Sequence, residues 1–235
     1  MSAPTSAPKS FDVTVSGCLF DLDGTLMLST DSVEAFWHDF AEKHNIDANE
    51  VLKESHGVRT IEMFKKYKPE FGNEEDTGNL EATIPKRWKH LAKPVPGVHD
   101  FLASLPADRW GVVTSGTYKM AIQWIEDFLQ IKKPPMFIAA EDIARGKPDP
   151  LGYLTGKERL GLGNEFLVFE DAPAGIRAGK AAGATVIGMA TTYDAKFVKD
   201  NGADIVIADL THIKVKSWDA EKKELVLSIT DAIYA

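Results

Sequence analysis

The chain of 235 residues has one cysteine, Cys18, so no disulfide can form within it. Cys18 lies in a short apolar run, which favours a buried strand position for its thiol. No apolar stretch approaches the roughly 20 residues that span a bilayer, and no Asn-x-Ser/Thr acceptor site occurs. The first ten residues are rich in Ser, Ala and Pro and lack the apolar segment of a secretory signal. We therefore expect residues 1–12 to be a disordered tail, and the protein to be cytoplasmic and to have no membrane partner.

Basic residues are outnumbered by acidic ones: the chain has 27 Lys and Arg and 35 Asp and Glu, which gives a net charge of −8. No basic stripe stands out, which argues against nucleic acid as a partner. The six histidines are scattered without the spacing of zinc ligands. Gly161-Leu162-Gly163 has Phe166 where a third glycine would complete a dinucleotide-binding fingerprint. The sequence thus argues against a nucleic-acid-binding protein, a zinc protein and a dinucleotide-binding protein.

A pair of acidic residues follows a short apolar run. Residues 17–20 are predicted to be a buried strand, and Asp21-Leu22-Asp23-Gly24-Thr25 follows it directly. Gly24 lets the backbone turn, so Asp21 and Asp23 can both point over the carboxyl edge of the sheet, where α/β folds bind ligands. One carboxylate can attack phosphorus and the other can transfer a proton. For these residues alone, a solvated acidic turn stays an alternative.

Two further segments offer groups that bind phosphate. The apolar run 110–114 leads into Thr114-Ser115-Gly116, whose hydroxyls and backbone N–H groups can contact phosphate oxygens. Lys147 lies in the loop Gly146-Lys147-Pro148-Asp149-Pro150 and can supply a point charge. A helix cap and a surface lysine are the ordinary alternatives for these segments.

A fourth segment carries carboxylates. The apolar run 167–169 ends in Glu170-Asp171, which can hold Mg²⁺, a hard cation that prefers oxygen ligands. An exposed turn is again the alternative for this segment alone. The four segments together predict a combined phosphate and metal site.

The apolar runs along the chain predict a doubly wound parallel sheet. They are continuous, as strands buried on both faces should be, and helical patterns separate most of them; they cover residues 17–20, 110–114, 136–140, 167–169, 185–190 and 205–208. Helices are expected at 118–129 and 174–182. Alternating apolar and polar residues at 213–217 and 225–229 predict a terminal hairpin at the sheet edge.

Residues 28–96 depart from this alternation. They read as helical throughout, with apolar residues including Phe36 and Trp37 at helical spacing, and Pro94 and Pro96 mark a stiff return linker. We expect this insert to be an α-helical cap over a Rossmann-like core made of residues 13–27 and 97–235. Trp37 and Trp88 are better explained as cap core than as platforms that stack on a sugar.

In this order, the four segments resemble the signature of haloacid-dehalogenase-type phosphatases: DLDGT, VTS, GKPDP and FEDAPAG. The resemblance extends over essentially the whole chain after residue 12. It implies that Asp21 is the nucleophile and Asp23 the general acid and base. It also implies that Lys147 bridges nucleophile and phosphate, while Thr114 and Ser115 bind the phosphate.

The same resemblance implies Mg²⁺ as the cofactor. Its ligands would be Asp21, Glu170, Asp171 and the backbone carbonyl of Asp23. Ala172 stands where many relatives carry serine, a departure that does not touch the metal ligands.

Shorter stretches are similar to small fungal phosphatases of the glycerol-3-phosphatase and 2-deoxyglucose-6-phosphatase types. Ser55-His56-Gly57-Val58-Arg59-Thr60 is shared with both types. The resemblance implies that His56 and Arg59 reach the substrate from the cap, with a surface salt-bridge pair as the alternative. It predicts hydrolysis of small sugar or polyol phosphates, and we expect the protein to be a monomer. A sugar phosphomutase and a non-catalytic phosphate-binding module stay open as alternatives.

Overall fold

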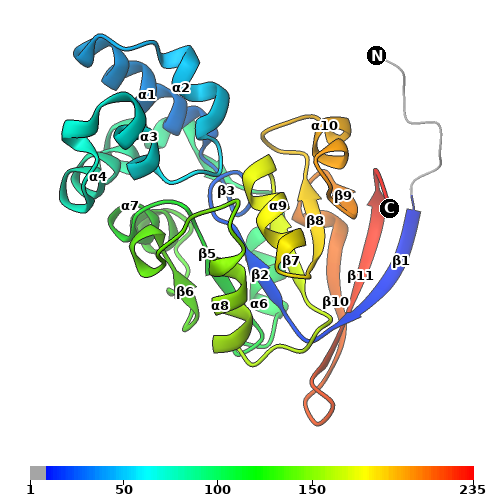
Figure 1. Cartoon of the computed structure of the whole chain (residues 1–235). Helices are drawn as coiled ribbons and strands as arrows, with labels where there is room; N and C mark the ends of the chain where they lie inside the picture. The colour runs from blue at the N-terminus through cyan, green and yellow to red at the C-terminus, as the bar shows by residue number, and fades with distance from the viewer. Residues whose placement is uncertain (1–8) are drawn as a thin grey trace.

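The computed structural model describes residues 9–235, and a six-stranded parallel sheet forms its centre (Figure 1). In spatial order the strands are β6 (Phe137–Ile138), β5 (Trp110–Val113), β2 (Cys18–Phe20), β7 (Leu167–Glu170), β8 (Thr185–Met189) and β9 (Ile205–Ile207). Each neighbouring pair is parallel. The strands fall where the apolar runs predicted them, and the doubly wound α/β prediction is confirmed.

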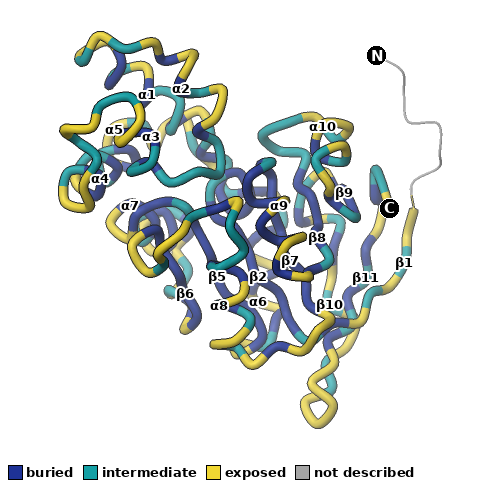
Figure 2. Tube along the Cα trace, in the orientation of Figure 1, coloured by how far each residue is buried: buried dark blue, intermediate teal, exposed yellow. Residues whose placement is uncertain are grey.

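Both faces of this sheet are covered, which explains why its strands read as continuous apolar runs. Leu19, Val113 and Val168 point to one face and pack with α8 (Leu151–Arg159), α9 (Pro173–Ala181) and α10 (Ala195–Asp200). Phe20 and Phe169 point to the other face, where their rings stack at 4.5 Å. Figure 2 shows the strands of the sheet as a buried layer.

The second face is covered by two helices and a small antiparallel sheet. The helices are α6 (Val98–Ser104) and α7 (Tyr118–Ile122), which continues as a π-helix, η3 (Gln123–Phe128). The small sheet has the order β1 (Lys9–Val15), β11 (Glu224–Ala232), β10 (Ile213–Asp219). Two short 3-10 turns, η4 (Ala140–Asp142) and η5 (Leu210–His212), complete the core.

The small sheet corrects two predictions. The hairpin of β10 and β11 forms as predicted, but in a sheet of its own, which a bridge between Val206 and Tyr234 links to β9. Residues 9–12 were wrongly assigned to the tail, because they belong to β1, which pairs along β11. The core therefore begins at Lys9, and the remainder of the predicted tail, residues 1–8, lies outside the described residues.

The insert after β2 is a helical layer over one end of the sheet (Figure 1). Its helices are α1 (Thr30–His44), α2 (Ala48–Ser55), α3 (Thr60–Tyr67), α4 (Glu74–Glu81) and α5 (Ile84–Trp88), with 3-10 turns η1 (Pro69–Phe71) and η2 (Lys89–Leu91). Asn45 ends α1 with a left-handed backbone (φ 52°), a common way to stop a helix. Asp47 then begins α2 by accepting a hydrogen bond from the backbone N–H of Asn49.

Aromatic side chains hold the insert together. Trp37 is 1% exposed, and its ring lies 5.3 Å from that of Phe64. Trp88 is half-buried and lies edge-on to Phe36, with the Arg87 guanidinium 4.2 Å from its ring. The interpretation of both tryptophans as part of the packing of the insert is confirmed.

A short antiparallel ribbon connects the insert to the core. It pairs β3 (Met27–Leu28) with β4 (Lys93–Pro94). The sequence predicted only a proline-stiffened linker here, because two-residue strands leave no periodic pattern. The helical insert lies between the two strands of the ribbon, and we propose residues 28–96 as a mobile cap hinged there. Within residues 9–235, no helix is both long enough and apolar enough to cross a membrane.

Candidate active site

The site begins where β2 ends. Asp21 is 5% exposed, and its backbone N–H donates to the carbonyl of Phe169 on the neighbouring strand β7. Gly24 has φ +85°, and a Cβ there would lie 2.0 Å from Oδ2 of Asp171. Glycine is therefore required both for the turn and for the close approach of the Asp171 carboxylate. The turn places Asp21 and Asp23 in the wall of one cavity, as predicted.

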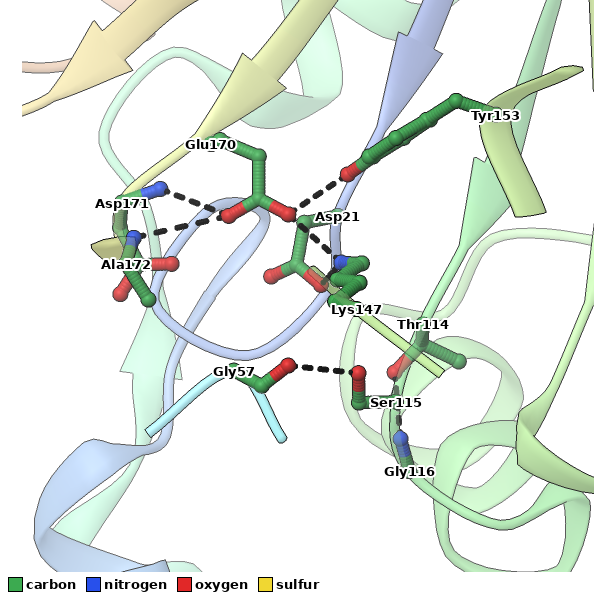
Figure 3. A network of polar contacts seen from close by, with 10 residues as sticks. All are labelled: Asp21, Gly57, Thr114, Ser115, Gly116, Lys147, Tyr153, Glu170, Asp171 and Ala172. Atoms are coloured by element: carbon green, nitrogen blue, oxygen red, sulfur yellow. Dashed lines mark hydrogen bonds and ion pairs between the residues drawn. The ribbon is translucent and has the colours of Figure 1, made fainter. Parts of the chain in front are cut away.

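Lys147 brings a positive charge into this buried group (Figure 3). Its Nζ lies 2.5 Å from Oδ1 of Asp21 and 2.6 Å from Oε1 of Glu170. Burial alone would lower the pKa of Lys147, but attraction by these two carboxylates outweighs burial and raises the pKa. The hydroxyl of Tyr153 donates to the same Oε1 of Glu170 at 2.6 Å. Lys147 is thus a fixed ammonium directed at the carboxylate of Asp21.

Asp21, Glu170 and Asp171 form a compact buried carboxylate cluster. One oxygen from each lies within 4.8 Å of the others, and Lys147 is the one cation in contact with them among residues 9–235. Burial raises the pKa of Asp21 well above its usual range, and Glu170 and Asp171 raise it further while Lys147 lowers it. Burial and the charge of Glu170 raise the pKa of Asp171 to about 7. A buried excess of negative charge on oxygen donors fits a hard divalent cation such as Mg²⁺.

Asp23 is placed differently from Asp21. It accepts a hydrogen bond from the hydroxyl of Ser29 at 2.5 Å on Oδ1. Burial raises the pKa of Asp23, and the Ser29 hydrogen bond and the charge of Lys147 offset part of that rise. A carboxyl with a raised pKa that faces the cavity is suited to give and take a proton.

The turn after β5 brings Thr114, Ser115 and Gly116 to the same cavity, whose volume is about 60 Å³. The hydroxyl of Thr114 accepts from the backbone N–H of Gly116 at 3.0 Å. The hydroxyl of Ser115 donates across to the carbonyl of Gly57 in the cap at 2.8 Å. In this arrangement, the predicted phosphate-binding segment also holds the cap against the core.

The two predicted cap residues have separate positions. Both lie in the loop between α2 and α3. His56 lines the cavity, with its Nε2 3.3 Å from a carboxylate oxygen of Glu34. Burial lowers the pKa of His56, although Glu34 opposes this shift.

Arg59 is not brought to the catalytic groups. Its guanidinium pairs with Glu62 and donates to the carbonyl of Ile143 at 3.0 Å and to that of Ala140 at 3.3 Å. These carbonyls belong to the core segment around η4, so Arg59 fastens the cap to the core. Its pair with Glu62 is therefore not a free surface ion pair, and its contact with substrate stays a prediction from the sequence.

Several residues near the site were missed from the sequence. Ser29 and Tyr153 orient Asp23 and Glu170 by hydrogen bonds, but a lone hydroxyl in a helical or loop segment gives no pattern. Glu81 lines the cavity from the end of α4 and accepts from the backbone N–H of Thr117 at 2.7 Å. Burial raises the pKa of Glu81 to about 7, although its hydrogen bonds lower it. In the sequence, Glu81 closes an acidic stretch that looks like a solvated helix face.

The fold and the four segments at one sheet edge define a hydrolase class. The chain belongs to the haloacid dehalogenase-like hydrolases, whose family profile matches residues 18–189, and the resemblance noted in the sequence is confirmed. It is 42% identical to glycerol-1-phosphate phosphohydrolase 2 of Saccharomyces cerevisiae, over 97% of this chain and 95% of that protein. It is 39% identical to 2-deoxyglucose-6-phosphate phosphatase 2 of the same yeast, over 84% and 89% of the two chains. A solved hydrolase from Pseudomonas syringae superposes with a TM-score of 0.71 at 26% identity, over 83% of this chain and 94% of that one.

Proposed function

We propose that this protein is a Mg²⁺-dependent phosphatase that hydrolyses small sugar or polyol monophosphates through a phosphorylated aspartate. One observation carries the proposal: Asp21, held by Lys147 and beside Asp171, faces the same small cavity as Asp23. A nucleophile, a proton donor and a charged clamp are the groups that phosphoryl transfer requires. The similarity to two named sugar and polyol phosphatases supports the substrate class.

The chain's residues can perform two displacements at phosphorus. A carboxylate oxygen of Asp21 forms a bond to phosphorus, and the bond to the leaving alcohol oxygen breaks as Asp23 donates its proton to that oxygen. Asp23 then takes a proton from water, which attacks phosphorus and releases the Asp21 carboxylate. Lys147 offsets negative charge on the phosphoryl oxygens throughout. When bound by Asp21, Asp171, Glu170 and the carbonyl of Asp23, Mg²⁺ supplies further charge neutralisation.

The size of the cavity supports a small substrate and a moving cap. Its volume of about 60 Å³ is well below the roughly 300–1,000 Å³ of pockets that enclose drug-sized ligands. The cap therefore has to lift to admit a substrate and then close over it. Glycerol phosphate and 2-deoxyglucose 6-phosphate are the leading candidates. Cytoplasmic location and a monomeric state stay predictions from the sequence.

Phosphate release from a substrate panel tests this function. The panel contains glycerol phosphates, hexose 6-phosphates with their 2-deoxy forms, a nucleotide and a phosphopeptide, each with Mg²⁺ present. We expect hydrolysis of the polyol and sugar esters and its loss in Asp21→Asn, which removes the nucleophile at nearly constant volume. Preference for the nucleotide or phosphopeptide would refute the substrate class. Isomerisation of a sugar phosphate that depends on a bisphosphate would instead support a phosphomutase.

A further inference from the structure

The cap contributes two buried polar side chains to the catalytic cavity that the proposed chemistry does not use. Ser55 ends α2 and Glu81 ends α4, and both line the cavity together with Asp23. We infer that Ser55 and Glu81 recognise hydroxyl groups on the alcohol part of the substrate and so set its specificity. The inference rests on the proposed function and deepens it.

The side chain of Ser55 lacks a hydrogen-bond partner in the structure. Ser55 is 7% exposed, and its Oγ is buried and makes no hydrogen bond with the described residues. A buried hydroxyl left unpaired costs about 1–3 kcal/mol, so it is retained where something else satisfies it. Because Ser55 is one of the residues that line the cavity, a substrate hydroxyl bound there is well placed to do so.

Glu81 places a carboxyl group at a buried position where an unpaired negative charge would be unfavourable. It is 3% exposed, has no ion pair within residues 9–235, and lies close enough to Asp23 to feel its negative charge. Its Oε2 accepts a hydrogen bond from the backbone N–H of Thr117, and hydrogen bonds from the side chains of Thr60 and Thr117 also lower its pKa. A carboxyl group has about four acceptor positions, so these contacts leave room for a further donor. A hydroxyl is a suitable partner, since it can donate to Glu81 without adding negative charge beside Asp23.

The remaining cap wall suits the carbon skeleton of the same molecule. Val33 and Ile84 line the cavity beside Ser55 and Glu81. A polyol or sugar presents both hydroxyls and C–H surface, and this wall offers partners for each. A plain alkyl phosphate would satisfy the apolar side chains but leave Ser55 and Glu81 unpaired. We therefore expect it to be disfavoured about 10-fold to 100-fold, as the loss of a buried hydrogen-bond partner implies.

The test compares glycerol phosphate with propyl phosphate, which has the same carbon chain without the free hydroxyls. The measured quantity is the ratio of kcat/KM for the two esters, so that a general loss of activity cancels. We expect a high ratio in the wild type and a ratio about 10-fold lower in Ser55→Ala and in Glu81→Met. Glu81→Gln keeps acceptor oxygen for Thr117 and for a hydroxyl, and should retain most of the ratio. Glu75→Gln, an exposed change on the same helix, is the matched control.

The outcomes separate the two proposals. If the wild type hydrolyses both esters and the ratio is unchanged in Ser55→Ala and Glu81→Met, the two residues are structural and the inference is overturned. If the wild type hydrolyses no phosphate ester of the panel, the proposed function fails, and the inference fails with it. A lower ratio in both variants, with the ratio kept in Glu81→Gln, supports hydroxyl recognition by the cap.

Discussion

At the scale of residues, the site sets one buried ammonium against a cluster of buried carboxyl groups. Lys147 contacts Asp21 and Glu170 directly, while Asp171 completes the group without a cation of its own. Such an arrangement is costly in a low-dielectric interior, because each carboxylate loses hydration. The cost is concentrated where a divalent cation and a phosphoryl group would be bound, as expected of an active site.

Glu81 gives a pH prediction at this scale. Its pKa of about 7 in the folded protein lies above the 4.5 that is ordinary for a glutamate side chain, so the folded state binds the proton more tightly. The wild type therefore loses stability as pH rises between these values, by on the order of 3 kcal/mol from a rise of about 2.5 units. Glu81→Gln carries no proton to lose and still accepts from Thr117.

Thermal unfolding at several pH values checks this prediction. We expect Glu81→Gln to melt at a higher temperature than the wild type at pH 8, and the difference to shrink toward pH 5. A difference that is constant across this range would show that the carboxyl of Glu81 does not titrate there. Glu75→Gln, on the exposed side of α4, should show no pH-dependent difference from the wild type.

The residues that meet at the candidate site were largely predictable, while the residues that orient them were not. Asp21, Asp23, Lys147 and Asp171 each follow a recognisable strand or lie in a motif, so local pattern located them. Ser29, Tyr153 and Glu81 act through contacts made only after folding: Glu81 meets Thr117 from 36 positions away. No local pattern records such a contact.

At the scale of elements, hydrogen bonds between the cap and the core hold the cap over the site. Ser115 donates to Gly57, Glu81 accepts from Thr117, and Arg59 donates to the carbonyls of Ala140 and Ile143. The sequence predicted the cap and the parallel strands, because long periodic segments determine them. It missed β1 and the β3–β4 ribbon, because β1 pairs with β11 at the far end of the chain and β3 and β4 have two residues each.

Arg59→Ala tests the fastening role of this side chain. Because Arg59 contacts core carbonyls instead of the cavity, we expect kcat/KM to fall about 10-fold, as the loss of buried charged hydrogen bonds implies, and by a similar factor for every substrate. Steady-state kinetics on glycerol phosphate, a hexose 6-phosphate and a small aryl phosphate measure this. A loss confined to the larger esters would instead place Arg59 against the substrate, as the sequence suggested.

A second arginine of the cap provides the control. Arg87 pairs with Asp39 on the surface of the cap, and its guanidinium lies over Trp88. Arg87→Ala removes a similar charge without touching the core. Unchanged kinetics in Arg87→Ala would show that the effect of Arg59→Ala comes from the fastening and not from the charge of the cap.

At the scale of the whole molecule, metal binding should be coupled to stability. The carboxylate cluster joins the turn after β2 to the end of β7, so a bound cation would stabilise the folded core. A ligand at 100 times its dissociation constant adds about 2.7 kcal/mol, which raises the melting temperature of a chain of this size by roughly 5–10 °C.

Thermal unfolding with chelator and with Mg²⁺ measures this coupling. We expect Mg²⁺ to raise the melting temperature of the wild type and to have little effect on Asp171→Asn, which lacks one carboxylate of the cluster. Glu221→Gln, an exposed change in the turn between β10 and β11, should respond as the wild type does. An equal rise in Asp171→Asn would place the metal elsewhere.

In the proposed mechanism Asp21 takes the phosphoryl group before water does, and the stereochemical course at phosphorus distinguishes this route from direct attack by water. The measurement uses a glycerol phosphorothioate made chiral at phosphorus by one 16O and one 18O, hydrolysed in water enriched in 17O, so that the thiophosphate released is itself chiral. Two in-line displacements, by Asp21 and then by the acceptor, predict net retention of configuration. Net inversion would mean that the acceptor attacks the substrate directly, and would contradict the assignment of Asp21 as the nucleophile.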